Sequence, residues 1–209
     1  MKIAVFGASG RTGRPFVQQA LAAGHTLIAL VRTPATFPIK HKNLTVVPGD
    51  AMNASDVELV VQEADAVVSA LGQTKNSPKD MQTVATKNIV AAMNKYGITR
   101  LVSLTGAGVD APQDKPKLMN HIIKFALKTM SGAVLQDAEQ HAAVLRDSTL
   151  NWVIVRGPML TEGPYTGKYR VGWVGINTGA RISRADVADF MLKQVTDDTY
   201  LQKAPMISD

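Results

Sequence analysis

The chain has 209 residues, enough for one well-buried core and too few for a second large domain, so we expect a single domain over residues 1–209. It has no cysteine, which excludes disulfides, thiolate nucleophiles and zinc–cysteine or iron–sulfur sites. Its 23 Lys and Arg outnumber its 17 Asp and Glu, for a net charge of +6. These basic residues are scattered, which argues against a nucleic-acid partner and fits a positive cleft for an anionic cofactor.

No apolar stretch reaches the ~18 residues that a membrane span needs. Residues 7–14 are polar and glycine-rich where the apolar part of a signal peptide would lie. We therefore expect a cytoplasmic protein without a membrane partner, present as a monomer or a weak homodimer.

A strand, a glycine-rich turn and a helix follow one another at the N-terminus. Residues 2–6 are an apolar run, the sequence GASGRTG comes next, and apolar residues then recur at helical spacing. This order is typical of a dinucleotide site, because the glycines permit a tight turn, a close approach of backbone to pyrophosphate and close helix packing. The start of the helix then faces the phosphates. The residues predicted to bind the cofactor here are Gly7, Ser9, Gly10, Arg11, Thr12 and Gly13.

The second predicted strand, residues 26–31, leads to Arg32, and no Asp or Glu occurs between Gly13 and Asp50. An acid at this strand tip binds the ribose 2′-hydroxyl of NAD, whereas a basic residue accommodates the 2′-phosphate of NADP. Arg32, helped by Arg11, therefore predicts NADPH in preference to NADH. The alternative is an exposed arginine without a ligand.

The third predicted strand, residues 44–47, is followed by Gly49 and Asp50. The fourth predicted strand, residues 65–70, leads into an ALG sequence at residues 70–72. Asp50 can accept a hydrogen bond from the adenine amino group or can cap a turn. A capping box at residues 55–58 predicts the start of a helix between these strands. The residues predicted to bind the cofactor at these two tips are Asp50, Ala51, Leu71 and Gly72.

Later elements follow the same alternation of helix and strand. Residues 80–95 predict a long helix, and 118–130 and 134–146 predict two helical runs with a bend or break at Ser131-Gly132. Residues 100–105 and 151–155 predict strands five and six, residues 168–174 one or two short strands, and residues 204–207 a final edge strand. Ser183 is predicted to cap the last helix. The residues predicted to face the cofactor or the acceptor are Thr105, Gly106, Pro158 and Met159.

Strands that alternate with helices predict an α/β fold with a doubly wound parallel sheet, the NAD(P)-binding Rossmann fold, with a small C-terminal elaboration. The ligand site then lies beyond the carboxyl ends of the strands, and residues of about 156–182 form its substrate side. His121 and His141 lie on predicted helices and are candidate proton donors, with a solvated or packed histidine as the alternative.

One motif follows each of the six strands: GASGRTG, LVR, PGD, ALG, SLTGAG and VRGPML. Together they resemble the atypical short-chain dehydrogenase/reductases, in particular the NAD(P)H-binding family of biliverdin reductase B, also called flavin reductase. The resemblance covers the whole chain, including NIVAAM, AAVLRDS and ISRADVADFML. It implies an NADPH-dependent reductase of broad specificity that holds flavins or other flat conjugated acceptors loosely over the nicotinamide. A flavin would then be a substrate rather than a bound cofactor.

Two departures bear on the chemistry. Ordinary short-chain dehydrogenases use Tyr-x-x-x-Lys to protonate a carbonyl, and none of the four tyrosines here has a lysine four residues later. Biliverdin reductase B has a serine after the threonine that ends strand five, and this chain has Gly106 there. The role of that serine therefore does not carry over, and flavins or quinones are favoured over bilins. Thr105 is left to position the nicotinamide or the acceptor.

A second class of function is a non-catalytic NADP sensor like the NmrA-type regulators, which share the glycine motif and lack the tyrosine–lysine pair. Such a sensor is expected to carry a partner-binding extension. Only residues 161–177 are available for one here, so the enzyme is the favoured interpretation.

Overall fold

Six parallel strands form most of the main sheet in the computed structural model, which describes residues 1–74 and 76–209 apart from the side chains of 127 and 130. These strands are β1 (Lys2–Phe6), β2 (Thr26–Val31), β3 (Leu44–Pro48), β4 (Ala66–Ser69), β5 (Arg100–Gly106) and β6 (Asn151–Gly157). Four short strands are β7 (Met159–Thr161), β8 (Arg170–Gly172), β9 (Arg181–Ser183) and β10 (Met206–Ser208). The main sheet has the order β3-β2-β1-β4-β5-β6-β10-β8, with only β8 antiparallel, and β7 pairs with β9 separately.

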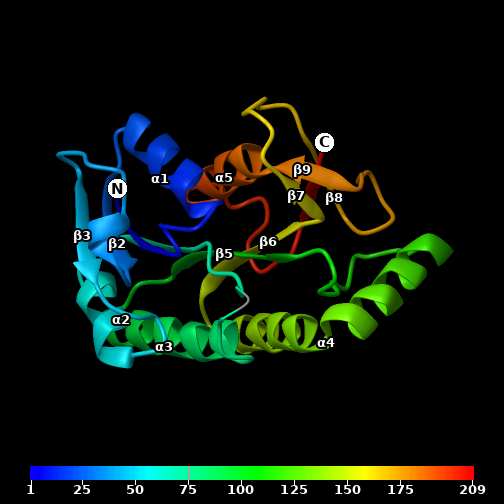
Figure 1. Ribbon diagram of the computed structural model, residues 1–209, viewed down its shortest axis with the longest axis horizontal. Helices are drawn as coiled ribbons and strands as arrows, with labels where there is room; N and C mark the ends of the chain where they lie inside the picture. The colour runs from blue at the N-terminus through cyan, green and yellow to red at the C-terminus, as the bar shows by residue number, and fades with distance from the viewer. Residues whose placement is uncertain (75) are drawn as a thin grey trace.

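Helices cover both faces of this sheet (Figure 1). On one face lie α1 (Gly13–Ala22) and α5 (Arg184–Lys193), on the other lie α2 (Ala54–Val61), α3 (Met81–Tyr96) and α4 (Leu118–Arg146), and a short 3-10 helix, η1 (Pro34–Thr36), follows β2. Alternate strand residues feed two core layers, so Val5 packs in the layer of Phe16 and Val187 while Phe6 packs in that of Ile89. The strand sequences are nearly continuous apolar runs because both faces of the sheet are covered.

The predicted α/β fold with a doubly wound parallel sheet is confirmed. From β1 the chain moves outward to β2 and β3 and then returns to β4 on the other side, so the strand order reverses beside β1. The predicted bend in the 118–146 region is present as a kink in α4 at Ser131, whose φ of −142° and ψ of 37° are not helical. Gly97 ends α3 in the left-handed conformation, with φ of 71°.

Two local predictions are wrong, and one local feature was not predicted. The capping box at residues 55–58 is not used, because Asn53 caps α2 and its side chain accepts from the Ser55 N–H at 3.1 Å. The last strand, β10, is not at the edge, because it lies between β6 and β8. The short strands β7 and β9 were not predicted, since three residues carry too little periodicity and their pairing is not local.

A buried ion pair holds the C-terminal side of the sheet together. Arg156 in β6 is 0% exposed, and its guanidinium donates to both carboxylate oxygens of Asp114 at 2.7 Å. It also donates to the carbonyls of Val109 at 2.7 Å and Ala204 at 2.6 Å. Asp114 accepts in addition from the Val174 N–H at 2.9 Å. The pair therefore joins β6 to the loop after β5, to the segment before β10 and to the turn after β8.

We expect Arg156→Met to lower the free energy of unfolding by about 3–5 kcal/mol, because it leaves the buried Asp114 charge without its partner. Urea unfolding at neutral pH measures this. Arg181→Met is the matched control, because it breaks an exposed pair with Asp209 and should cost at most about 1 kcal/mol. Equal losses in the two variants would contradict the role assigned to Arg156.

The same pair predicts a pH dependence. Burial raises the pKa of Asp114, but the hydrogen bonds from Arg156 and from backbone N–H groups outweigh it, so the pKa lies below its usual value. A lowered pKa in the folded state stabilises the fold above the unfolded value, and this contribution is lost as pH falls through the folded pKa. The difference between wild type and Arg156→Met should therefore shrink in acid.

Candidate functional site

The carboxyl ends of β1 to β6 lie along one edge of the sheet, because all six strands are parallel. Every residue predicted to bind cofactor lies at the carboxyl end of one of these strands, in the segment directly after it, or at the start of the next helix. The edge is centred on β1, where the strand order reverses, and this is where doubly wound sheets bind their ligands. The structure therefore places the predicted residues in the expected topological position.

The glycine turn after β1 owes its shape to two contacts. Gly7 has φ of +77°, and a Cβ there would lie 2.6 Å from the Ala70 carbonyl oxygen. A Cβ on Gly13 would lie 2.0 Å from the carbonyl oxygen of Gly7. Around Gly10 the nearest obstacle to a Cβ is the Gly7 oxygen at 3.1 Å, with no other atom within 4 Å. Gly7 and Gly13 thus permit packing, while Gly10 leaves an open face for a ligand.

The turn also suits an anion. Helix α1 begins with no acidic residue in its first turn, and within the described part of the chain its N-cap, Thr12, makes no capping hydrogen bond through its side chain. Ser9, Gly10 and Arg11 are exposed, and Thr12 is buried. Arg14 donates to the Ser9 carbonyl at 2.9 Å, which fixes the loop without using its N–H groups. N–H groups at a helix start that no side chain caps are a fitting cradle for a pyrophosphate.

Two arginines at the site have different surroundings. Arg32 is exposed after β2 and takes part in no salt bridge among residues 1–74 and 76–209. Arg11 faces Glu162 at 3.5 Å, and Glu162 also pairs with Arg184 at 2.7 Å. The Arg32 guanidinium is therefore available to a 2′-phosphate, whereas Arg11 is held toward the segment that follows β7.

Asp50 caps a turn, which is the second of the two roles that the sequence allowed for it. One carboxylate oxygen accepts from the Met52 N–H at 3.0 Å, and the Asp50 N–H donates to Asp56 at 2.9 Å. The neighbouring Ala51 is buried, and its carbonyl accepts from Asn88 at 3.0 Å. These bonds fix the tip of β3, and the contact of Asp50 with adenine stays a prediction.

The tips of β4, β5 and β6 form the other half of the site. Thr105 is buried, and its hydroxyl has no hydrogen-bond partner among the described residues. Next to it Gly106 is exposed, and a Cβ at Gly106 or at Gly72 would meet no atom of the described residues within 4 Å, its chain neighbours aside. An unpaired buried hydroxyl costs free energy unless a ligand satisfies it. Thr105 therefore fits a carboxamide or an acceptor carbonyl beside open space.

The remaining predicted residues frame this space. The Leu71 carbonyl accepts from Gln82 at 2.9 Å, which fixes the tip of β4. The Ala107 N–H donates to the Gly157 carbonyl at 2.9 Å and joins the tips of β5 and β6. Pro158 is half-buried, and Met159 is exposed enough to contact a ring. The residues present therefore fit a dinucleotide.

His141 is a packed histidine rather than a proton donor open to the site. It is 2% exposed, and its two ring nitrogens face the hydroxyls of Thr86 at 2.7 Å and Ser103 at 3.3 Å. Burial lowers the pKa of His141 to about 4, so the ring is neutral at pH 7. His121, the other candidate, is exposed on the first half of α4.

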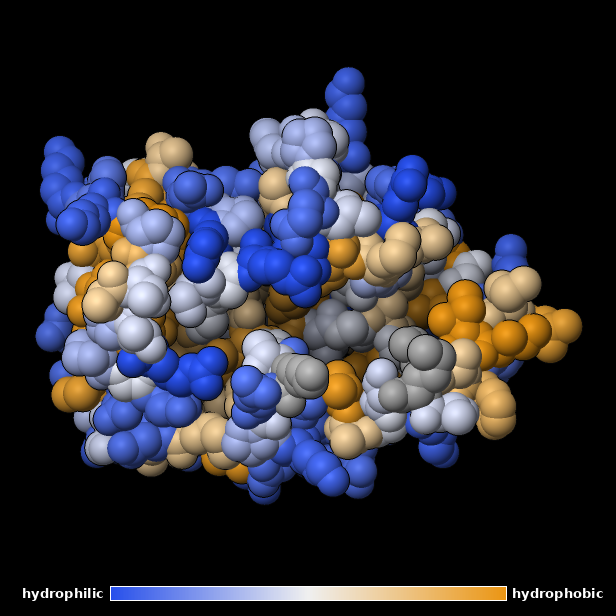
Figure 2. Space-filling model, in the orientation of Figure 1, coloured by the Kyte–Doolittle hydropathy of each residue, from blue (hydrophilic) through white to orange (hydrophobic). Residues whose placement is uncertain are grey.

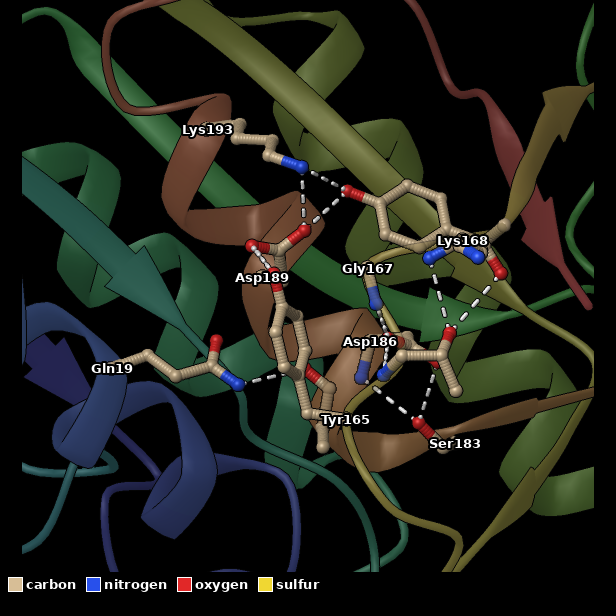
Figure 3. A network of polar contacts seen from close by, with 11 residues as sticks. Gln19, Tyr165, Gly167, Lys168, Ser183, Asp186, Asp189 and Lys193 are labelled. Carbon is tan, nitrogen blue, oxygen red and sulfur yellow. Dashed lines mark hydrogen bonds and ion pairs between the residues drawn. The ribbon is translucent and has the colours of Figure 1, made fainter.

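The predicted substrate-side segment is anchored to α5 by contacts that were not predicted from the sequence (Figure 3). On α5, Asp186 accepts from the backbone N–H groups of Thr166 at 2.8 Å and Gly167 at 2.9 Å. One turn later, Asp189 accepts from the Tyr169 hydroxyl at 2.6 Å. The sequence predicted only the cap at Ser183, because contacts about 20 residues apart in the chain leave no periodic signal.

This anchor includes a tyrosine beside a lysine. The ammonium of Lys193 lies 3.0 Å from the Tyr169 hydroxyl and 2.7 Å from Asp189 (Figure 3). Burial and the hydrogen bond with Asp189 raise the pKa of Tyr169 well above its usual value. The catalytic pair of ordinary short-chain dehydrogenases needs a lowered tyrosine pKa, so this contact holds the segment in place instead.

Comparisons with known proteins agree with this geometry. A family model described as NAD(P)H-binding matches residues 7–198. Reductase pytE of Aspergillus terreus is 28% identical over 99% of this chain and 97% of its own length. A short-chain dehydrogenase/reductase of Veillonella parvula, solved in complex with NADP, has a TM-score of 0.82 at 22% identity, over 100% of this chain and 94% of its own. The anaerobilin reductase ChuY of Escherichia coli O157:H7 has a TM-score of 0.77 at 21% identity, over 100% and 97%.

The neutral His141 predicts a pH dependence of stability. Its folded pKa of about 4 lies below the unfolded value of 6.5, so the unfolded chain binds more protons between these values. The free energy of unfolding should therefore fall as pH drops from about 6.5 toward 4. Urea unfolding across this pH range measures how the free energy of unfolding changes with pH. His141→Gln should remove the part of this change that comes from the histidine. His121→Gln, at an exposed position, is the control and should leave the slope unchanged.

Proposed function

The chain belongs to the NAD(P)H-binding family and is an oxidoreductase, and we propose that it is an NADPH-dependent reductase of flavins, quinones or similar flat conjugated acceptors. Named reductases among the similar proteins support the reductase activity. The NADP complex of the similar Veillonella parvula structure supports the cofactor.

The observation that carries the proposal is the open end of β5. Thr105 offers a buried hydroxyl that pairs with none of the described residues, and Gly106 leaves space where the acceptor would lie. An electron-poor conjugated acceptor takes a hydride readily and its proton from water, so it needs positioning more than an acid. A site with a free hydrogen-bonding group and free space meets this need.

The predicted site residues divide the binding of cofactor and acceptor among them. NADPH, when bound, supplies the hydride. The turn from Gly7 to Gly13 binds the pyrophosphate, and Arg32 binds the 2′-phosphate. Thr105 orients the carboxamide or the acceptor, and Pro158 and Met159 pack on the ring.

A turnover assay tests the activity. We expect loss of NADPH absorbance on addition of FMN, FAD or menadione, with biliverdin a poorer acceptor because Gly106 supplies no side chain. Thr105→Val should lower kcat/KM by about 2- to 10-fold, since one neutral hydrogen bond is lost. Thr45→Val, at an exposed position of β3, is the control and should leave kcat/KM unchanged. Tight NADPH binding by calorimetry without turnover of any acceptor would contradict the reductase and favour the sensor.

The Arg32 assignment predicts a change of coenzyme preference. Arg32→Asp should raise KM for NADPH by roughly 10- to 100-fold, because it removes a charge-assisted contact, and should leave KM for NADH nearly unchanged. Lys42→Asp makes the same charge change on the loop that precedes β3, away from the strand tips, and serves as the control. An unaltered NADPH affinity in Arg32→Asp would refute the role of Arg32.

A further inference from the structure

The kink at Ser131 divides α4 into two halves with different surroundings. After the kink, Asp137, Ala138, His141, Ala142 and Leu145 are buried against the rest of the protein. Before it, no described side chain of residues 118–129 is buried, and this half projects beyond the sheet (Figure 1). The exposed apolar residues of this half are Leu118 at 77%, Met119 at 64%, Ile122 at 53%, Ile123 at 51% and Phe125 at 74%.

The projecting half is amphipathic, but its apolar face is turned outward. Helical spacing puts Asn120, Lys124 and Lys128 on one face and the exposed apolar residues on the other. Lys124 pairs with Asp110 and, at 3.6 Å, with Glu139, so the polar face is directed toward the body of the protein. Figure 2 shows the resulting apolar tip at the right of the molecule. A contiguous apolar patch of this kind marks an interaction site.

The stretch of chain that carries the patch has charges of one sign only. No Asp or Glu occurs from residue 115 to residue 136, and the lysines of this stretch are Lys115, Lys117, Lys124 and Lys128. All of them except Lys124 are exposed and form no salt bridge among the described residues. A two-fold pairing of this face with a second copy would bring these like charges together, which disfavours self-association.

We propose that residues 118–130 are a membrane-surface helix that binds an anionic lipid bilayer. An apolar face with basic residues along its border is the pattern by which amphipathic helices lie at the level of the lipid headgroups. The exposed lysines of this stretch, without Lys124, would face the anionic headgroups while Leu118, Ile122 and Phe125 enter the acyl boundary. Within the described part of the chain, none of the helices has the length and apolarity that a membrane span requires. The proposed contact with a bilayer differs from the sequence-based expectation of no membrane partner. It does not depend on which acceptor the enzyme reduces.

Vesicle flotation of the full chain tests the proposal. The protein should float with vesicles of phosphatidylcholine mixed with phosphatidylglycerol, should float poorly with phosphatidylcholine alone, and should be released by high salt. Lys117→Gln with Lys128→Gln should weaken partitioning on the order of 30-fold, from the usual contribution of each lysine at such a surface. Ile122→Glu with Phe125→Glu should reduce flotation to background.

Matched controls separate the patch from a general effect. Leu59→Glu changes an apolar residue that is 52% exposed on α2, and Lys42→Gln removes a distant exposed lysine, so both should float like wild type. NADPH binding and circular dichroism of every variant should match wild type, because the projecting half has no buried described side chain.

Three results would overturn the proposal. The first is no flotation with any vesicle, and the second is equal flotation with neutral and anionic vesicles. The third is a concentration-dependent dimer, seen by sedimentation, that Ile122→Glu with Phe125→Glu abolishes. That result would make this face an interface between copies of the chain.

Discussion

The close contact between α1 and the turn after β1 sets the geometry of the candidate site. Gly13 lies so near the Gly7 carbonyl that no Cβ fits between them, and Gly7 approaches the Ala70 carbonyl in the same way. Only glycine allows β1, β4 and α1 to meet at this point. Of the residues between the two glycines, Ser9, Gly10 and Arg11 are exposed, at the edge where the other strand tips lie. An arrangement made of backbone alone leaves the helix start free for an anion.

The proposed acceptor side, the segment from β7 to β9, is built in a different way. This segment has little regular structure, and carboxylates hold it by accepting from backbone N–H groups. Asp114, paired with Arg156, fixes the turn at Val174, and Asp186 fixes the loop at Thr166. Burial raises the pKa of Asp186, but its hydrogen bonds outweigh burial and keep the carboxyl charged. The cofactor side therefore depends on local backbone shape, and the acceptor side on long-range ion pairs and hydrogen bonds.

This difference explains what could be predicted from the sequence. The strands at 2–6 and 26–31, the sheet topology and the glycine turn follow from local patterns, and the structure has them at those residues. Asp114 and Arg156 are 42 residues apart, and Asp137 caps the start of α3 at Thr83 from 54 residues away. No spacing rule connects such pairs, because tertiary packing alone brings them together. The placement of β10 inside the sheet has the same cause.

Helix α4 shows a further limit of sequence patterns. Both of its halves are amphipathic, so periodicity predicts a helix on either side of Ser131 without saying what each apolar face meets. The second half reaches the sheet and is buried there, whereas the first half, beyond the kink, turns Ile122 and Phe125 to solvent. An apolar face without a core partner breaks the agreement between local pattern and global fold. Natural proteins break that agreement mainly where function requires it, which makes the projecting half the part of α4 whose partner lies outside the chain.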